Sequence, residues 1–163
     1  MNAPVLSSSA RRFKTALAEQ GHEIDVVTLS DSTRTTQEAA DTIGCRVAQI
    51  AKSIVFRDSE EDQPVVVITS GTNRVDIRKI EVLMGHSLEQ ADGNFVKKKT
   101  GYAIGGVPPA GHKSPVRMFL DKDLQAFDEI WAAAGTPFSV FQLTPEELPE
   151  ITGADWHDVA LIC

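Results

Sequence analysis

Lys52 is a charged side chain in a segment that otherwise has the composition of a hydrophobic core. Within residues 50–56, it and Ser53 are the polar positions, and the remaining residues are Ile, Ala, Val and Phe. An ammonium group that points into a cleft offers a positive charge and hydrogen-bond donors to a phosphate or a polarised carbonyl. A lysine at the start of a strand can also extend its charged end into solvent, so a structural role and a functional role both stay open.

A loop rich in glycine and proline, residues 100–112, is the second feature that could serve a ligand. Gly105 and Gly106 can adopt positive φ or let a ligand approach the backbone, whereas Pro108 and Pro109 fix φ and lack an N–H donor. This combination suits a shaped, ligand-facing loop, and a tight connection between strands is the simpler alternative. His112 ends the loop and could act as a base or hydrogen-bond donor near neutral pH, or lie on the surface without a role.

Basic and polar residues lie close to these two features in sequence. The basic residues are Lys97, Lys98, Lys99, Lys113 and Arg117. They could form a small site for phosphate groups, or simply a solvated helix end. Asn73 and Arg74 are weaker candidates for similar polar contacts.

Motifs of several common enzyme classes are absent from the chain. It has no G-x-S-x-G elbow, no H-E-x-x-H pair and no Walker-type phosphate loop, and Gly101 to Gly106 has the wrong spacing for a dinucleotide fingerprint. Its two cysteines, Cys45 and Cys163, show neither a disulfide framework nor the spacing of metal ligands. We therefore expect no cofactor, no metal and free thiols in a reducing compartment.

The length and charge of the chain limit its organisation and its partners. With 163 residues it fits one domain, residues 1–163, that can bury a substantial core. A net charge of −7 argues against a broad face for duplex DNA, although a small basic patch could still hold the end of a nucleic acid. The N-terminus lacks the pattern of a signal peptide, and no segment is apolar enough to span a bilayer. We expect a cytoplasmic protein with neither a membrane nor DNA as partner.

The elements that position Lys52 and the loop mix hairpins with helices. Apolar spacing and capping residues predict helices over residues 7–20, 35–43, 76–84 and 92–99, and a short one that starts near residue 144 and is shortened or bent by the proline at 149. Apolar runs predict strands over residues 23–29, 53–57, 65–69, 116–120, 139–143 and 156–162, with polar loops at 30–34 and 70–74. A helical turn delivers Lys52 to the start of its strand, which forms a central hairpin with residues 65–69. This order favours a mixed or antiparallel sheet over a doubly wound one.

Taken together, these segments resemble the YbaK/ProX family of aminoacyl-tRNA deacylases, which also occurs as the editing domain inserted in many bacterial prolyl-tRNA synthetases. The matching segments are residues 32–35 (Ser-Thr-Arg-Thr) with 38–40 (Glu-Ala-Ala), 49–56 (Gln-Ile-Ala-Lys-Ser-Ile-Val-Phe), 70–76 (Ser-Gly-Thr-Asn-Arg-Val-Asp) and 100–112. The lysine strand and the glycine-proline loop stand in the family's order and separation. The resemblance covers nearly the whole chain.

The resemblance implies a fold, an activity and two central site features. The fold class is α/β (α+β): one compact domain with a curled, mostly antiparallel mixed sheet that forms a barrel-like core surrounded by helices. The activity is trans-editing, in which the ester that joins a wrong amino acid, usually alanine or cysteine, to the terminal adenosine of tRNA(Pro) is hydrolysed. Lys52 matches the family's essential lysine. Residues 105–109 match its G-x-x-x-P loop, which meets the aminoacyl group largely through backbone atoms.

The candidate site residues and partners follow from this resemblance. The catalytic candidates are Lys52, Gly105 and Gly106, and the substrate-binding candidates are Ser53, Asn73, Tyr102, Val107, Pro108, Pro109 and His112. The implied partners are the acceptor end of aminoacyl-tRNA(Pro) and prolyl-tRNA synthetase, which could help deliver the substrate to an acidic protein that binds tRNA weakly.

The preferred amino acid, the base and turnover itself stay open. Ser53 stands where alanine-specific members typically carry asparagine and cysteine-specific members threonine, which leans toward cysteine, whereas Pro108, Pro109 and His112 are closer to free-standing ProX proteins. No residue stands out as a nucleophile, and the base is a water held by Ser53 or His112, or a group of the substrate. The alternatives to an editing enzyme are a non-catalytic module for a nucleotide or aminoacyl-adenylate-like ligand, and a general hydrolase of small esters.

Overall fold

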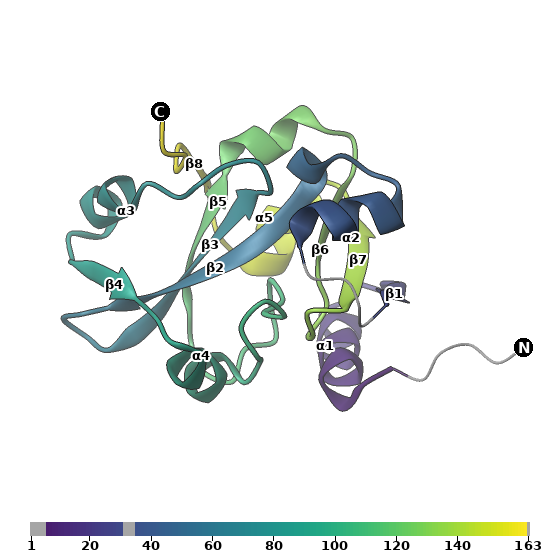
Figure 1. The fold of residues 1–163 in the computed structure, drawn as a ribbon. Helices are drawn as coiled ribbons and strands as arrows, with labels where there is room; N and C mark the ends of the chain where they lie inside the picture. The colour runs from purple at the N-terminus through teal and green to yellow at the C-terminus, as the bar shows by residue number, and fades with distance from the viewer. Residues whose placement is uncertain (1–5, 31–34, 163) are drawn as a thin grey trace, which may run out of the picture.

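One mixed sheet of eight strands runs through the molecule (Figure 1). The computed structural model describes residues 6–30 and 35–162. In space the strands follow the order β1-β7-β6-β2-β3-β5-β8, and β4 pairs with β2 outside this path. The strands are β1 (Val26–Thr28), β2 (Ile50–Asp58), β3 (Gln63–Ser70), β4 (Leu88–Gln90), β5 (Arg117–Asp121), β6 (Ile130–Ala133), β7 (Ser139–Leu143) and β8 (Trp156–His157).

The hairpin of β2 and β3 forms the centre of this sheet, as predicted. The two strands pair antiparallel, with Lys52 opposite Thr69 and Ser53 opposite Ile68. The beginning of β2 also pairs in parallel with β6, and its end pairs antiparallel with β4. β3 is buried along nearly its whole length, which agrees with its continuous apolar run.

Antiparallel and parallel pairings occur together, so the predicted mixed sheet is confirmed. The antiparallel pairs are β1–β7, β2–β3, β2–β4 and β6–β7, and the parallel pairs are β2–β6, β3–β5 and β5–β8. The expected barrel-like closure is not seen in the pairings of residues 6–30 and 35–162, because no pairing joins β1 to β8. These two terminal strands have only three and two residues, which leaves little backbone with which to close the sheet.

The first four helices begin and end close to where their capping residues predict, whereas the last begins at Glu147 and not near residue 144. They are α1 (Ser8–Glu19), α2 (Thr36–Ile43), α3 (Ile77–Met84), α4 (Gly93–Thr100) and α5 (Glu147–Thr152), with short 3₁₀ helices η1 (Val47–Gln49) and η2 (Lys122–Ala126). Thr35 caps α2 by accepting a hydrogen bond from the amide of Glu38, as the capping-box pattern predicts. Gly44 and Gly85 then end α2 and α3 with positive φ.

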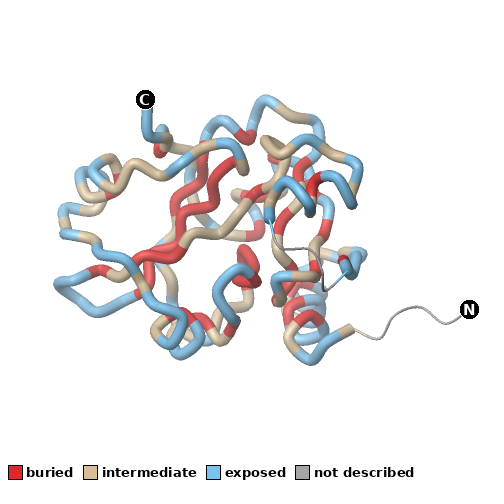
Figure 2. The backbone as a smooth tube through the Cα atoms, in the orientation of Figure 1, coloured by how far each residue is buried: buried red, intermediate tan, exposed pale blue. Residues whose placement is uncertain are grey.

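Alternate residues of β2 pack into two different apolar clusters, because successive side chains of a strand face opposite sides. Val55 belongs to the larger cluster, which also holds Phe13 of α1. Phe56 belongs to the smaller cluster, which holds Ile80 of α3. Figure 2 shows the buried backbone concentrated along these central strands, with exposed segments around them. The second half of β2 is therefore supported from both sides.

The structure differs from the sequence prediction at several strands. β2 begins at Ile50, so Lys52 lies inside the strand and not at its start. The sequence pattern does not predict β4 or β6, because β4 is short and the Ile-Trp-Ala-Ala of β6 has few residues that favour strands. β8 ends at His157, and beyond it an isolated bridge joins Val75 to Ala160. Residues 31–34, which belong to the first predicted polar loop, lie outside the described residues.

Candidate functional site

A pocket of about 400 Å³ lies beside the first half of β2. Its volume falls in the range of small-molecule sites, roughly 300–1,000 Å³. Most of its lining is apolar, and its walls come from α2, β2, β6 and the glycine-proline loop. The lining residues are Leu29, Thr35, Thr36, Ala39, Ile50, Ala51, Lys52, Ser53, Ile54, Val55, Gln90, Ala91, Ile104, Gly105, Trp131, Ala132, Ala133, Pro137 and Val140. We call this space the β2 pocket.

Lys52 brings the one cationic side chain of the lining residues to the β2 pocket. The residue is half-buried, and its Nζ donates one long hydrogen bond, 3.4 Å, to the carbonyl oxygen of Gly71. Burial lowers the pKa of the Lys52 ammonium below its usual value, and the positive charge of Arg74 lowers it further. With a single weak acceptor, the ammonium keeps donors available for a ligand.

Ser53 also lines this pocket, and its hydroxyl is unpaired. Its Oγ is buried, and it is the one buried side-chain nitrogen or oxygen of the described residues that has no hydrogen-bond partner. Leaving such a group unpaired costs about 1–3 kcal/mol, and native structures rarely do so. Ser53 lines the pocket, and because its Oγ is screened from solvent, a ligand or a water held there can supply the missing partner only after the side chain turns toward the pocket.

Gly105 is the position at which the glycine-proline loop reaches the β2 pocket. Its φ of +86° lies in the left-handed region that favours glycine. Among the described residues, its backbone N–H has no hydrogen-bond partner, so it is free to donate to a ligand. Gly105 therefore combines the predicted backbone freedom with an available donor.

Gly106, the other glycine predicted to be catalytic, packs closely against a neighbouring segment and is not among the lining residues. Its N–H already donates to the carbonyl oxygen of Ala103 at 2.9 Å. A Cβ at this position would lie 2.6 Å from backbone atoms of Thr136, much closer than side-chain atoms approach one another. The glycine lets the loop press against residues 136–137, which carry Pro137 into the pocket wall.

Four other predicted substrate-binding residues lie in the interior, behind the pocket wall. They are Tyr102, Val107, Pro108 and Pro109, all buried and none of them part of the lining. The hydroxyl of Tyr102 donates to the carbonyl oxygen of Gly111 at 3.2 Å, and the guanidinium of Arg12 lies 4.5 Å from the centre of its ring. These contacts fix the shape of the loop and give no direct contact with a ligand in the β2 pocket.

His112 forms a hydrogen bond within the loop and does not line the pocket. Its Nε2 lies 2.7 Å from the carbonyl oxygen of Pro108. Since a carbonyl oxygen can only accept, Nε2 carries the proton. Burial lowers the pKa of His112, with the hydrogen bond to Pro108 opposing part of this shift, so the ring tends to stay neutral. This arrangement gives His112 a role in loop shape.

Asn73 is also held away from the pocket. Its Nδ2 donates to Oδ2 of Asp121 and Oδ2 of Asp123, both at 2.8 Å. Asp121 is buried and accepts further hydrogen bonds from the Thr69 hydroxyl at 2.9 Å and the Ser70 amide at 3.0 Å. Asn73 thus fixes the loop that follows β3 to the end of β5.

Sequence reasoning missed the apolar wall of the pocket. Trp131 and Pro137 line it from the far side, and Ile104, which is 59% exposed, stands at its lip. Apolar side chains of this kind look like ordinary core residues in a sequence. Their position depends on the pairing of β6 with β2, which joins segments far apart in the chain.

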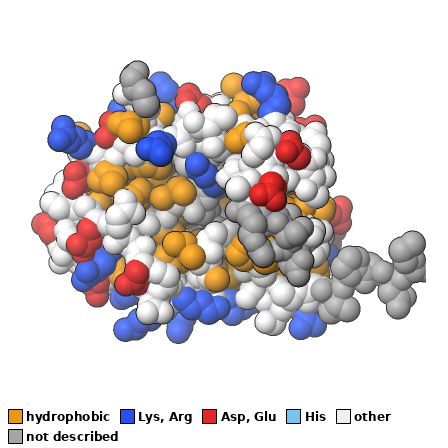
Figure 3. Space-filling model, viewed as in Figure 1, with side chains coloured by type: hydrophobic (Ala, Val, Ile, Leu, Met, Phe, Trp, Pro, Cys, Tyr) orange, Lys and Arg blue, Asp and Glu red, His pale blue; other side chains and the backbone are white. Residues whose placement is uncertain are grey.

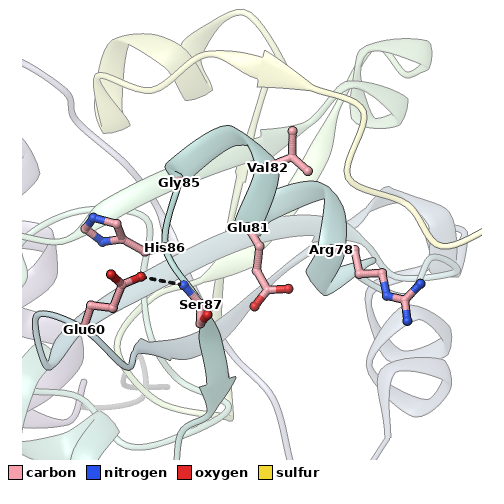
Figure 4. Close-up of a pocket in the computed structure, with 7 residues that line it drawn as sticks. All are labelled: Glu60, Arg78, Glu81, Val82, Gly85, His86 and Ser87. Atoms are coloured by element: carbon pink, nitrogen blue, oxygen red, sulfur yellow. Dashed lines mark hydrogen bonds between the residues drawn. The ribbon is translucent and has the colours of Figure 1, made fainter.

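A second hollow, of about 540 Å³, lies beside α3 and near the turn after β2 (Figure 4). We call it the His86 hollow. Two of its polar side chains have close partners: His86 Nδ1 lies 2.7 Å from Oδ2 of Asp58, which lies outside the lining, and Glu60 accepts from the amide of Ser87 at 3.0 Å. One atom each of Asp58, Glu60 and His86 lies within 4.8 Å of the others, a spacing compatible with a metal ion, but these partnerships already occupy the side chains.

The contact between His86 and Asp58 shifts the pKa of both groups. The hydrogen bond to Asp58 raises the pKa of His86. Burial by itself would raise the pKa of Asp58, but the hydrogen bonds from His86 and from the amides of Glu60 and Glu61 lower it. In contrast to the β2 pocket, the hollow offers a ligand no orphaned buried hydroxyl.

Basic side chains border an apolar band on one face of the molecule. Figure 3 shows hydrophobic side chains across the middle of this face, with Lys and Arg side chains beside the band and along its lower edge, where α4 lies. Lys97 and Lys98 are exposed in the last turn of α4, where positive charge suits the helix dipole. They remain available to a phosphate backbone.

Comparison with known proteins agrees with the family resemblance of the sequence. Residues 30–151 match the family described as the aminoacyl-tRNA editing domain. The uncharacterized protein YwhH of Bacillus subtilis (strain 168) is 34% identical over 152 residues, 93% of this chain and 96% of that protein. The "Putative Cys-tRNA(Pro)/Cys-tRNA(Cys) deacylase EbsC" of Enterococcus faecalis (strain ATCC 700802 / V583) is 24% identical over 131 residues, 80% of this chain and 79% of that protein.

A solved structure agrees over nearly the whole fold. It is described as a "putative trans-editing enzyme for prolyl tRNA synthetase", is 45% identical and superposes with a TM-score of 0.92 over 97% of this chain and 100% of that chain. None of the helices in residues 6–30 and 35–162 is long and apolar enough to cross a membrane. The matched residues 30–151 include Lys52, Ser53 and Gly105. The chain therefore belongs to the aminoacyl-tRNA editing domain family, the YbaK/ProX family that its sequence resembles.

Proposed function

We propose that this protein is a trans-editing deacylase that hydrolyses the ester of mischarged tRNA(Pro) carrying cysteine or alanine. The observation that carries the proposal is the pairing of Lys52 with Ser53 in the β2 pocket, where the ammonium has one weak acceptor and the buried hydroxyl has none. Family membership supplies the substrate class, an aminoacyl-tRNA. The name of the Enterococcus faecalis relative supports cysteine as one of the amino acids removed.

The proposed reaction is direct attack of water on the aminoacyl ester. Water adds to the carbonyl carbon, the bond from that carbon to the ribose oxygen breaks, and the ribose oxygen takes up a proton. Free amino acid and tRNA with an intact terminal hydroxyl result. An aminoacyl ester is already activated, so holding it against the water supplies much of the rate enhancement.

Each polar group of the pocket has a part in this reaction. Negative charge develops on the carbonyl oxygen, and the Lys52 ammonium and the free Gly105 N–H are the donors available to stabilise it. Ser53 holds the attacking water or the substrate through its otherwise unpaired hydroxyl. His112 is placed outside the pocket lining, which favours Ser53 over His112 as the group that holds the water.

The apolar wall provides selection by size. Trp131, Pro137 and Ile104 surround a space in which a small side chain fits beside the ester. A hydrophobic pocket gains only about 1–3 kcal/mol per methylene when it selects the larger ligand. Excluding the larger proline ring by steric conflict is the more effective route, so correctly charged prolyl-tRNA(Pro) is spared.

The same proposal includes partners and location. The acceptor end of tRNA(Pro) enters the pocket, and prolyl-tRNA synthetase delivers it, because a chain of net charge −7 attracts tRNA weakly. An enzyme with this substrate works in the cytoplasm, where aminoacyl-tRNA is made and used. The main alternative is a module that binds a nucleotide or aminoacyl-adenylate-like ligand in the same pocket without turnover.

A deacylation panel tests the proposal. The protein is incubated with cysteinyl-, alanyl- and prolyl-tRNA(Pro) and the release of each amino acid is followed, with Lys52→Ala as control. We expect wild-type protein to hydrolyse the cysteinyl or alanyl ester and to spare the prolyl ester. Hydrolysis of none of the three would favour the binding module. Equal activity on free amino-acid esters would favour a general esterase.

A further inference from the structure

The loop that carries Gly105 is attached to α1 at both of its ends. At the start of the loop, Nη2 of Arg12 donates to the carbonyl oxygen of Gly101 at 2.6 Å. At the far end, Gly111 lies so close to α1 that a Cβ added to it would be 3.3 Å from Cβ of Ala16. In Figure 1, α1 lies at the lower edge of the molecule, with the loop that follows α4 beside it. The stretch between these two attachments, with Gly105 in it, is therefore held on one helix.

Tyr102 joins the two attachments to each other. The guanidinium of Arg12 lies 4.5 Å from the centre of the Tyr102 ring, a distance at which a cation is attracted to an aromatic face. Tyr102 is fully buried, and its hydroxyl donates to the carbonyl oxygen of Gly111 at 3.2 Å. Arg12 thus contacts the start of the loop directly and its end through the tyrosine.

The same helix also contacts the opposite wall of the β2 pocket. Gly135 lies against the beginning of α1, where an added Cβ would be 2.7 Å from the carbonyl oxygen of Ser9. Two residues further on, Pro137 lines the pocket, and its Cγ lies 3.6 Å from the place that a Cβ of Gly105 would take. All of α1 belongs to the described residues, and none of it lines the pocket. α1 therefore holds two segments that meet at the pocket without reaching the pocket itself.

We propose that Arg12 is a positioning residue, which acts on the reaction through Gly105 and makes no contact with the substrate. The inference rests on the proposed function, in which the Gly105 N–H donates to the carbonyl oxygen of the ester. Such a donor is effective when it is fixed where the negative charge develops. Because the Gly105 N–H has no partner among the described residues, its place depends on the contacts of the loop around it.

An arginine suits this task better than a lysine. Its planar guanidinium can donate from its edge to a carbonyl oxygen while its face lies on an aromatic ring, whereas an ammonium is a compact charge without such a face. The family match covers residues 30–151 and α1 lies before them, so family membership assigns no role to Arg12. Its role follows from the contacts alone.

Deacylation kinetics test whether Arg12 acts through the loop. The constants kcat and KM are measured for wild type, Arg12→Ala and Arg12→Lys on cysteinyl- or alanyl-tRNA(Pro) and on the matching 3′-aminoacyl ester of adenosine, which has no phosphate. Arg11→Ala is the matched control, because Arg11 is an exposed arginine of the same helix whose side chain makes no contact with the described residues. All rates are taken at a temperature at which every variant is folded.

We expect Arg12→Ala to lower kcat about tenfold on both substrates and to leave KM nearly unchanged. A donor that is displaced loses part of the roughly 10²–10³-fold that it supplies when fixed, and the loss falls on the transition state. Arg12→Lys should recover part of kcat because it keeps the charge and a donor. Arg11→Ala should match wild type.

Three outcomes of these assays would overturn the inference. A loss on the tRNA alone, through KM, would mean that the exposed Arg12 contacts the phosphate backbone of the substrate. A lower Tm with unchanged kcat would mean that Arg12 stabilises the fold and has no part in positioning. An equal loss in Arg11→Ala would mean that the effect does not come from the contacts of Arg12 with the loop.

A measurement without turnover separates this inference from the proposed function. The backbone ¹⁵N order parameter and the amide chemical shift of Gly105 are compared in wild type, Arg12→Ala and Arg11→Ala, with the Lys52 amide as the reference in β2. We expect the chemical shift of Gly105 to move and its order parameter to fall in Arg12→Ala alone, whereas Lys52 keeps the value of about 0.85 that is typical of rigid backbone. If wild type hydrolyses no ester, this result still supports the attachment of Gly105 through Arg12, and the proposed function fails by itself. Unchanged values at Gly105 in Arg12→Ala would overturn the inference.

Discussion

The beginning of β2 and the glycine-proline loop both form walls of the β2 pocket, yet they treat their polar groups in opposite ways. On β2, Lys52 has one weak acceptor and Ser53 has no partner at all. In the loop, the Gly106 amide, the Tyr102 hydroxyl and the His112 ring are each bonded within the loop itself. β2 therefore leaves polar groups available to a ligand, whereas these polar groups of the loop form hydrogen bonds that fix the shape of the loop itself.

This difference separates residues that act on a substrate from residues that place them. Buried polar groups are nearly always paired, so those left unpaired in a pocket indicate where a ligand completes the structure. By this criterion β2 contributes the side-chain chemistry, and the loop adds the exposed Gly105 N–H as a backbone donor. Substitutions in the two regions should accordingly change different quantities.

The largest effect is expected at Lys52. Replacing it in Lys52→Met keeps the length and apolar stem of the side chain and removes the charge, so transition-state stabilisation is lost while the fold is retained. We expect kcat/KM for deacylation to fall about 10²–10³-fold, the usual range for one oxyanion donor. Lys14→Met, at an exposed position of α1, is the control and should match wild type. Equal activities of the two variants would place the chemistry elsewhere.

Gly106 tests the loop as a shaping element. In Gly106→Ala the new Cβ meets the Thr136 backbone at 2.6 Å, and overpacking of this kind costs about 1–3 kcal/mol in the free energy of unfolding. Denaturant titration measures this loss, and Gly93→Ala, where nothing lies within 4 Å of the added Cβ, is the control.

Gly105→Ala, strained by its positive φ, should also reduce activity. Both glycine variants should lose more activity than His112→Ala. If His112→Ala is the worst of the three, the loop carries a catalytic histidine.

Ser53 is expected to show opposite effects on stability and activity. Ser53→Ala removes an unpaired buried hydroxyl, so the free energy of unfolding of the ligand-free protein should stay equal or rise by about 1 kcal/mol. Deacylation should fall roughly tenfold, as for one lost hydrogen bond to water or substrate. Thermal unfolding and deacylation rates measured on the same samples check both. A stability loss together with unchanged activity would show that the hydroxyl has a structural partner.

The smallest expected effect is a change in thermal stability at the His86 hollow, which has no part in the proposed reaction. The folded pKa of His86 is raised above 6.5, so its contribution to stability is complete below that pH and is lost as the pH rises through the folded pKa. The folded pKa of Asp58 is lowered below 3.8, so its contribution is present above that pH and is lost as the pH falls. His86→Gln should reduce the Tm slightly at mildly acidic pH and hardly at alkaline pH, with activity unchanged. His22→Gln is the control, and a loss of activity in His86→Gln alone would bring the hollow into the mechanism.

Local signals in the sequence predict most helices and the central hairpin. Thr35 with Glu38, and Gly44 after α2, mark helix ends through bonds between near neighbours, so the pattern and the structure agree. β6 is not predicted, because a four-residue strand of Ile-Trp-Ala-Ala gives little pattern of its own and is held by pairing with β7 and, across a long stretch of chain, with β2.

The site residues also divide into those with a local signal in the sequence and those whose position depends on distant contacts. Lys52 and Gly105 are recognisable because a lysine among apolar residues and a glycine in a rigid loop are locally unusual, and both line the pocket. The positions of Tyr102 and Asn73 outside the pocket depend on contacts with Arg12 and Asp121, which the sequence around each residue does not reveal. The apolar wall has no local signal at all, since Trp131 is equally suited to a core.

The most direct measurement is a crystal structure of the protein with a hydrolysis-resistant analogue, in which an amide joins alanine or cysteine to the 3′ position of adenosine. We predict that the aminoacyl group lies in the β2 pocket, with Lys52 Nζ, Ser53 Oγ and the Gly105 N–H each within hydrogen-bond distance of the analogue. An analogue bound in the His86 hollow, or bound in the β2 pocket without contact to Lys52 and Ser53, would contradict it.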